Sequence, residues 1–136
     1  MIDGGIFMHQ IFETSHAPLP IGPYAQAIQA GNMVFVSGQI PLSPETGELA
    51  GPDLADQTRQ VLRNLQAILD QAGCKISEIV KTTVFMTDLK DFATFNKLYA
   101  EWLGSHTPAR STIQVAALPK GAQVEIEAII VKEIKR

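Results

Sequence analysis

Residues 61–86 read VLRNLQAILDQAGCKISEIVKTTVFM and hold the two patterns that decide the fold class. Apolar residues of the first half share one side of a helix: Val61, Leu62, Leu65, Ile68, Leu69 and Ala72. Asp53 upstream suits the N-cap of this helix, and Gly73 suits the position after its last turn. The second half, Ile79 to Met86, is rich in β-branched and aromatic residues and predicts a strand.

Toward the N-terminus the sequence predicts extended segments. Residues 9–14 favour a short strand, and a second extended run begins at Ala25. Met33–Gly38 predicts a further strand, and Gly31-Asn32 before it is a hairpin signal. Prolines predict loops over residues 17–23 and 40–52, because proline fixes φ and cannot continue a helix.

Toward the C-terminus a second helix and two strands are predicted. The helix begins after Asp91 as N-cap and ends at Gly104. Its apolar side consists of Phe92, Phe95, Leu98, Tyr99, Trp102 and Leu103. Strands are predicted over Arg110–Ala117 and Val124–Ile134, and the short connection between them favours a terminal hairpin by local turn rules.

This order of elements predicts an α+β fold in which one sheet packs on two helices. Two helices cover only one face of a sheet. Simple alternation places Ile79 and Phe85 on one face and Val80, Val84 and Met86 on the other, so the central strand is apolar on both sides. We therefore expect a second copy of the chain to cover the remaining face, in a homo-oligomer.

Composition narrows the class of protein. The 136 residues, 46% hydrophobic and 18% charged, predict a single domain over residues 8–136, preceded by a loose or disordered extension over residues 1–7. The net charge of −3 and the scattered Lys and Arg argue against a nucleic-acid partner. No apolar run approaches the roughly 20 residues of a membrane span. The single cysteine, Cys74, favours a reducing compartment, which we take to be the cytoplasm.

Standard metal, nucleotide and nucleophile motifs are absent from the sequence. His9, His16 and His106 lack the spacing of metal ligands, so no metal is predicted. No serine lies in a G-x-S-x-G elbow, and the glycine patterns of nucleotide-binding loops are missing. The sequence therefore predicts neither a metal nor a bound cofactor.

Two charged groups on strands remain as candidates for chemistry. Arg110 shares a strand face with Thr112 and Gln114, where a guanidinium could grip a carboxylate through two hydrogen bonds, or could form a structural ion pair with Glu125 or Glu127. Glu125 begins an apolar strand face and is either a charge at its rim or a carboxyl group with a raised pKa, poised for proton transfer. Taken singly, the other polar candidates have packing or capping roles: Tyr24, Ser37 and Asn96.

Six ordered segments identify a resemblance: 21–24 (IGPY), 36–41 (VSGQIP), 80–85 (VKTTVF), 88–92 (DLKDF), 108–111 (PARS) and 124–128 (VEIEA). Together they resemble the signature blocks of the RidA (YjgF) family, from about residue 14 to the end of the chain. The resemblance implies a mixed β-sheet packed on two helices in a chorismate-mutase-like (YjgF-like) fold. It also implies a homotrimer with ligand clefts between subunits, and a last strand inserted elsewhere in the sheet rather than in a terminal hairpin.

The resemblance also implies an activity that needs no metal or cofactor. Similar proteins hydrolyse reactive enamine and imine acids, such as 2-iminobutanoate and 2-iminopropanoate released by PLP-dependent dehydratases, to 2-oxo acids and ammonia. Alternatives are a non-catalytic small-molecule-binding or regulatory trimer, a chaperone-like trimer and an RNA-cleaving translation inhibitor. The sequence leaves open the preferred imine side chain, the partner enzyme and the source organism.

Carried over position by position, the resemblance assigns roles to six residues. Arg110 matches the arginine that holds the substrate carboxylate, and Glu125 matches the acidic residue that positions or activates water. Further substrate-binding positions match Tyr24, Ser37 and Asn96. Thr112 stands where the deaminase branch commonly has cysteine, so a thiol role is excluded and a role through the backbone remains.

Overall fold

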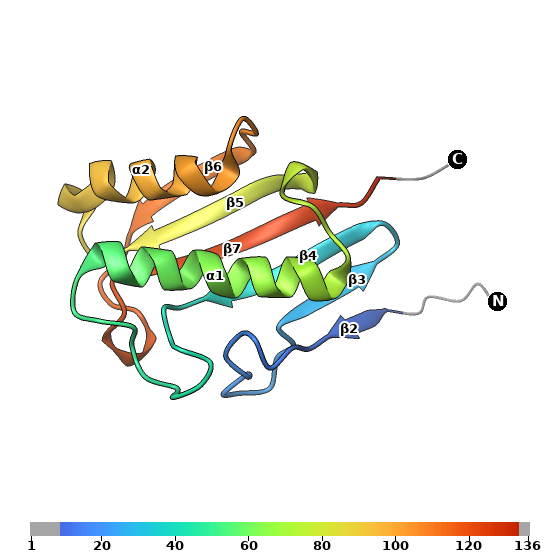
Figure 1. Ribbon diagram of the computed structural model, residues 1–136, viewed down its shortest axis with the longest axis horizontal. Helices are drawn as coiled ribbons and strands as arrows, with labels where there is room; N and C mark the ends of the chain where they lie inside the picture. Colours follow the sequence, from blue (N-terminus) through green and yellow to red (C-terminus); the bar gives the residue numbers. More distant parts are fainter. Residues whose placement is uncertain (1–8, 134–136) are drawn as a thin grey trace.

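Both helices lie on the same face of a single mixed sheet (Figure 1). The computed structural model describes residues 9–133. The strands are β2 (Gln10–Phe12), β3 (Ala27–Ala30), β4 (Met33–Gln39), β5 (Ile79–Met86), β6 (Ala109–Gln114) and β7 (Val124–Val131), and the helices are α1 (Leu54–Ala72) and α2 (Phe92–Leu103). The α+β class and the mixed sheet on two helices are thus confirmed. The extension expected over residues 1–7 lies outside the described residues.

The last strand, β7, lies in the middle of the sheet. The strand order is β2-β3-β4-β7-β5-β6, with β5 and β6 parallel and the other neighbours antiparallel. The terminal hairpin favoured by local turn rules is therefore wrong, and the insertion implied by the resemblance is confirmed. The physical reason is burial: alternate residues of β7, from Val124 to Ile130, fill the core beneath the helices, which an edge strand would do less completely.

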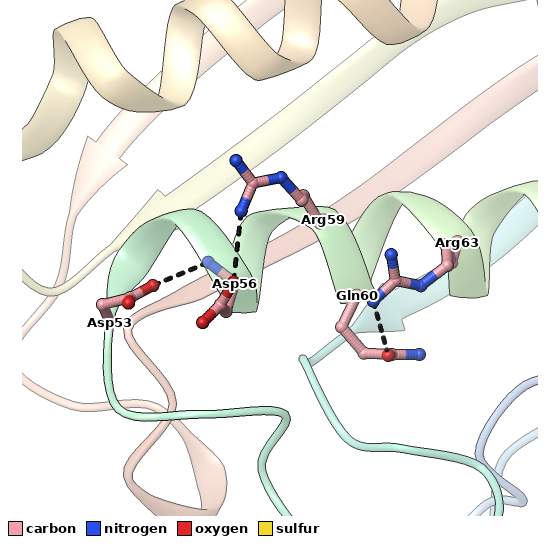
Figure 2. Close-up of polar contacts among 5 residues, drawn as sticks. All are labelled: Asp53, Asp56, Arg59, Gln60 and Arg63. Carbon is pink, nitrogen blue, oxygen red and sulfur yellow. Dashed lines mark hydrogen bonds and ion pairs between the residues drawn. The ribbon is translucent and has the colours of Figure 1, made fainter.

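Helix α1 begins and ends where the sequence predicts. The Asp53 carboxylate accepts a hydrogen bond from the Asp56 backbone N–H at 2.8 Å, and Gly73 ends the helix with φ of 71°. Figure 2 shows this cap at the start of the helix, together with the exposed Arg59–Asp56 ion pair and the hydrogen bond from Arg63 to the buried Gln60, each at 3.1 Å. The apolar side of α1 is left free to pack on β4 and β7.

Helix α2 also has the predicted bounds, but its first turn is capped differently. Asp91 occupies the N-cap position without a side-chain hydrogen bond to the helix. Asp88 instead accepts from the Lys90 backbone N–H at 2.9 Å in the short 3₁₀ turn that leads into α2. The prediction of Asp91 as N-cap residue is therefore confirmed, although the preceding turn, and not the Asp91 side chain, orders this entry.

The predicted faces of β5 are partly wrong because the strand contains a bulge. Its register with β7 shifts between Ile79 and Lys81, so Val80 is an extra residue. Ile79, which is 1% exposed, lies on the helix face together with the buried Val84 and Met86. Val80, in contrast, is 45% exposed. From Lys81 onward the strand alternates regularly, which turns Thr82 toward the helices.

Two predicted strands end early. β6 stops at Gln114 rather than Ala117, and β7 stops at Val131. The predicted end of the last strand, Ile134, lies outside the described residues. Neither helix within residues 9–133 has the length together with the apolar character that crossing a membrane requires.

The sheet face opposite the helices keeps many apolar side chains at alternate positions of its strands. Register places Ile11, Ile28, Met33, Phe35, Ile129 and Val131 on this face. Phe35, near its middle, remains 38% exposed in the single chain. We call this surface the outer face. Neither α1 nor α2 covers it.

Candidate functional site

The six predicted site residues divide into two groups that lie in different places in the fold. Arg110 pairs across the sheet with Thr82, whose side chain is buried beneath α2, so Arg110 lies on the helix face. Glu125 pairs with Phe85, which alternation places on the outer face. Arg110 and Glu125 of one chain therefore point away from opposite faces of the sheet. This separation excludes the structural ion pair between them that the sequence left open.

Arg110 belongs to the first group, and residues of α2 hold its side chain in place. Its Nη1 donates to Asn96 Oδ1 at 2.7 Å, and its guanidinium carbon lies 5.2 Å from the ring centroids of both Phe92 and Tyr99. The cation therefore gains a hydrogen bond and two aromatic faces, and no carboxylate within residues 9–133 forms an ion pair with it. The family resemblance assigned both Asn96 and Arg110 to substrate binding, and the structure shows that the two side chains are in contact.

Beside Arg110 lies a cavity of about 460 Å³. Its walls include Asn96, Tyr99, Leu103, His106 and Pro108. A half-buried guanidinium at the edge of a cavity with apolar walls is suited to a small carboxylate, because charge-assisted hydrogen bonds strengthen where water is partly excluded.

Thr112 follows Arg110 on the same face of β6, opposite Val84 of β5. Its Oγ1 is buried and has no hydrogen-bond partner among the described residues. A role for Thr112 through its backbone stays a prediction.

Tyr99 is a contact that sequence reasoning missed, because it was assigned only to the apolar side of α2. Its hydroxyl lies 2.6 Å from Thr82 Oγ1, and its ring stacks on Phe95 with centroids 5.3 Å apart. Burial raises the pKa of Tyr99, while the Thr82 hydrogen bond and the charge of Arg110 act in the opposite direction. Only the strand pairing, which the sequence pattern does not reveal, places Thr82 beneath this ring.

The second group gathers around Glu125 at the end of β4. A Cβ atom on Gly38 would overlap Glu125 Oε2 and lie 2.8 Å from its Cδ, so the carboxylate occupies the space above a bare backbone. Burial raises the pKa of Glu125, and the neighbouring charge of Glu127 raises it further. The sequence analysis places Gly38 only at the end of a predicted strand and in one segment of the family resemblance. Its missing side chain is what admits the carboxylate.

Ser37 and Tyr24 flank this position. The Ser37 hydroxyl donates to the Ala25 carbonyl at 2.5 Å, so its proton is engaged and its oxygen remains an acceptor. Tyr24 is 49% exposed and shares the lining of a small cavity with Gly38. Tyr24, Ser37 and Glu125 are thus neighbours through Gly38, while Asn96, Arg110 and Thr112 form the other group. Across residues 9–133, no three His, Cys, Asp or Glu side chains are grouped as metal ligands would be.

The chain is similar to known proteins over most of its length. Residues 14–132 match the family described as Endoribonuclease L-PSP. The chain is 50% identical over 128 residues to the 2-iminobutanoate/2-iminopropanoate deaminase of Escherichia coli, covering 92% of this chain and 99% of that protein.

Two solved structures share the fold. The crystal structure of E. coli TdcF with bound serine matches with a TM-score of 0.87 and 50% identity, covering 91% of this chain and 99% of that one. The Rid-family protein YyfA of Yersinia pestis matches with a TM-score of 0.90 and 48% identity, covering 92% and 100%. The site described above therefore lies within the region of similarity.

Proposed function

The chain belongs to the Endoribonuclease L-PSP family, which includes the RidA (YjgF) proteins, and we propose that it hydrolyses reactive 2-imino acids to 2-oxo acids and ammonia. We take 2-iminobutanoate and 2-iminopropanoate as substrates, in line with the name of the E. coli relative. The observation that carries the proposal is the Arg110 guanidinium, held by Asn96 and two aromatic rings at the edge of a cavity. Serine bound to TdcF, another small acid with a carboxylate, supports the same class of ligand.

The proposed site is completed by a neighbouring chain. Arg110 and Glu125 lie on opposite faces of the sheet within one chain, so one substrate can meet both only where two chains adjoin. The apolar outer face, with Phe35 at 38% exposure, supplies surface that such an assembly would bury. We propose a homotrimer in which Arg110 and Asn96 of one chain face Tyr24, Ser37 and Glu125 of the next.

The reaction divides between these two groups. Arg110 binds the substrate carboxylate and fixes C2 relative to a water molecule beside Glu125. The water oxygen attacks C2, a proton passes to the Glu125 carboxylate, and the C=N electrons move to nitrogen. Glu125 then returns the proton to nitrogen, which leaves a tetrahedral carbinolamine. A second proton passes from the carbinolamine hydroxyl through Glu125 to the amino nitrogen, the C–N bond breaks as the C=O bond forms, and ammonia leaves.

Such acid–base assistance contributes about 10² to 10⁴-fold, or roughly 3 to 5 kcal/mol of the barrier. The raised pKa of Glu125 suits this double role, because a group titrating closer to neutral pH both accepts and returns a proton more readily. For Thr112, we propose a contact to the substrate through its backbone. The substrate class links the protein to PLP-dependent dehydratases, and the single Cys74 fits a cytoplasmic setting.

The proposal is tested by turnover. Purified protein added to a dehydratase that generates 2-iminobutanoate is expected to accelerate the appearance of 2-oxobutanoate above the unaided rate. Heat-denatured protein is the control. Failure to accelerate hydrolysis, with the dehydratase alone as fast as the mixture, would exclude the deaminase function.

The family description gives a reason to test RNA in parallel. We expect no cleavage, because the surface combines a net charge of −3 with scattered cations. Cleavage of a single-stranded RNA by wild-type protein, without imine hydrolysis, would favour the RNA-cleaving alternative. Binding of a carboxylate without turnover would favour a sensor.

The pH profile provides a further prediction. Glu125 works as a carboxylate, so kcat/KM is expected to fall as the pH drops through its raised pKa. Glu127→Gln removes a negative charge that raises this pKa, and the acid limb should therefore move to lower pH. Glu101→Gln, an exposed change on α2, is the control and should leave the limb in place. An acid limb unmoved by Glu127→Gln would contradict the proposed base.

A further inference from the structure

We propose that Tyr99 is a positioning residue for Arg110, and that its hydrogen bond to Thr82 sets the position. The inference rests on the proposed function, because it concerns the same carboxylate-binding arginine. Two buried hydroxyl groups determine where the Arg110 guanidinium lies, and they thereby determine how well the protein binds the substrate carboxylate.

The contacts form a closed loop through three elements. Thr82 of β5 is the direct cross-strand neighbour of Arg110 on β6. The Thr82 hydroxyl lies 2.6 Å from the Tyr99 hydroxyl on α2, and the Tyr99 ring lies 5.2 Å from the guanidinium carbon of Arg110. Thr82, beside Arg110 in the sheet, thus fixes the Tyr99 ring that contacts the Arg110 guanidinium.

The hydrogen bond between the hydroxyls is deeply buried. Thr82 is 0% exposed and Tyr99 is 6% exposed. The Tyr99 ring is also held by Phe95, which stacks on it with centroids 5.3 Å apart and is itself fully buried. Because Phe95 stacks on the ring and Thr82 bonds its hydroxyl, the Tyr99 ring has little freedom to move.

An arginine side chain benefits more than most side chains from neighbours that fix its position before the ligand binds. Its long side chain loses several rotatable bonds when it is fixed, and a carboxylate must otherwise supply that ordering on binding. Asn96 holds one nitrogen of Arg110, and Phe92 and Tyr99 supply the two ring faces. Of the two rings, only Tyr99 carries a polar tip that anchors it to the sheet.

A purely structural role makes a different prediction. If the hydroxyl pair served packing alone, replacing both partners by apolar residues of similar shape would cost little and leave function intact. If the pair positions Arg110, the double replacement restores stability relative to either single variant, because no buried hydroxyl is left unpaired. Carboxylate binding would still be weakened.

The experiment compares Tyr99→Phe, Thr82→Val and the double variant with the wild type. We expect KM for 2-iminobutanoate to rise about five- to tenfold in all three, with kcat changed far less, because the carboxylate is held equally in ground and transition states. Thr58→Val is the matched control: it removes a buried hydroxyl in α1 that has no partner among the described residues. Its KM should match the wild type.

Direct calorimetric binding of 2-oxobutanoate separates this inference from the proposed function. Weaker binding by the double variant supports the positioning role even if the wild type does not turn over imines. Wild-type KM and wild-type affinity in a stably folded double variant would overturn it. A wild-type protein that neither turns over the imine nor binds the 2-oxo acid would overturn both proposals.

Discussion

An equal mixture of Arg110→Ala and Glu125→Gln chains is expected to regain about one quarter of the wild-type activity, although each variant alone is nearly inactive. Arg110→Ala removes the proposed charge-assisted contact to the substrate carboxylate, and Glu125→Gln removes the proposed proton-transfer group. Each change alone should lower kcat/KM by about 10²-fold or more.

The recovery follows from the two faces of the sheet. A site between chains is intact when the chain that supplies Arg110 carries the Glu125 change and its neighbour carries the Arg110 change. Each condition holds for half of the chains in a random mixture, so about one quarter of the sites have both groups. A site within one chain would never be repaired by mixing.

The mixture should be made by co-expression of differently tagged chains and purified through both tags, so that only mixed trimers are measured. Each mixed trimer has one intact site of three, so the purified sample should reach about one third of the wild-type activity. Each variant mixed with itself is the control. No recovery in a confirmed mixed assembly would contradict the site between subunits, while leaving open a deaminase confined to one chain.

Gly38→Ala is expected to remove most of the activity while leaving the fold intact. The new methyl group would overlap Glu125 Oε2 and approach its Cδ to 2.8 Å, so the carboxylate must move. The atoms that give way belong to the end of a side chain, which limits the cost in stability. Loss of a correctly placed acid–base group predicts a fall of about 10²-fold in kcat.

Gly22→Ala is the matched control for Gly38→Ala. It adds the same methyl group in the neighbouring loop, where the nearest atoms belong to the Tyr24 ring at an ordinary 3.7 Å. In a second arm, Gly38→Ala is added to Glu125→Ala, and no further loss is expected because the displaced carboxylate is already gone. Full activity in Gly38→Ala, or a further loss in the second arm, would contradict this role.

Local sequence patterns predicted the elements well where short-range physics dominates. The apolar side of α1, its Asp53 cap and Gly73 at its end are all set by contacts within the helix. The central place of β7 is set instead by long-range pairing with β4 and β5. Local turn rules therefore pointed to a hairpin, and the family resemblance was needed to correct it.

The candidate site shows the same division. Arg110 and Glu125 could be selected as charged residues on strands, and alternation assigned each to a face of its own strand. The relation between those faces depends on which strands pair, and this information is absent from local patterns. Tyr99 and Gly38 were overlooked for a similar reason, because their importance lies in partners from distant segments, Thr82 and Glu125.

The bulge at Val80 has a consequence for how the site tolerates change. The bulge absorbs the extra residue: Ile79 pairs with Ile130 and Lys81 with Ile129, so Thr82 faces Tyr99. Unbroken alternation from Ile79 through Val80 would turn Thr82 to the opposite face. Val80 itself is 45% exposed. The site should therefore accept substitution of Val80 and even its deletion, which would restore regular alternation from Ile79 to Lys81 and keep the anchor of Arg110 in the core.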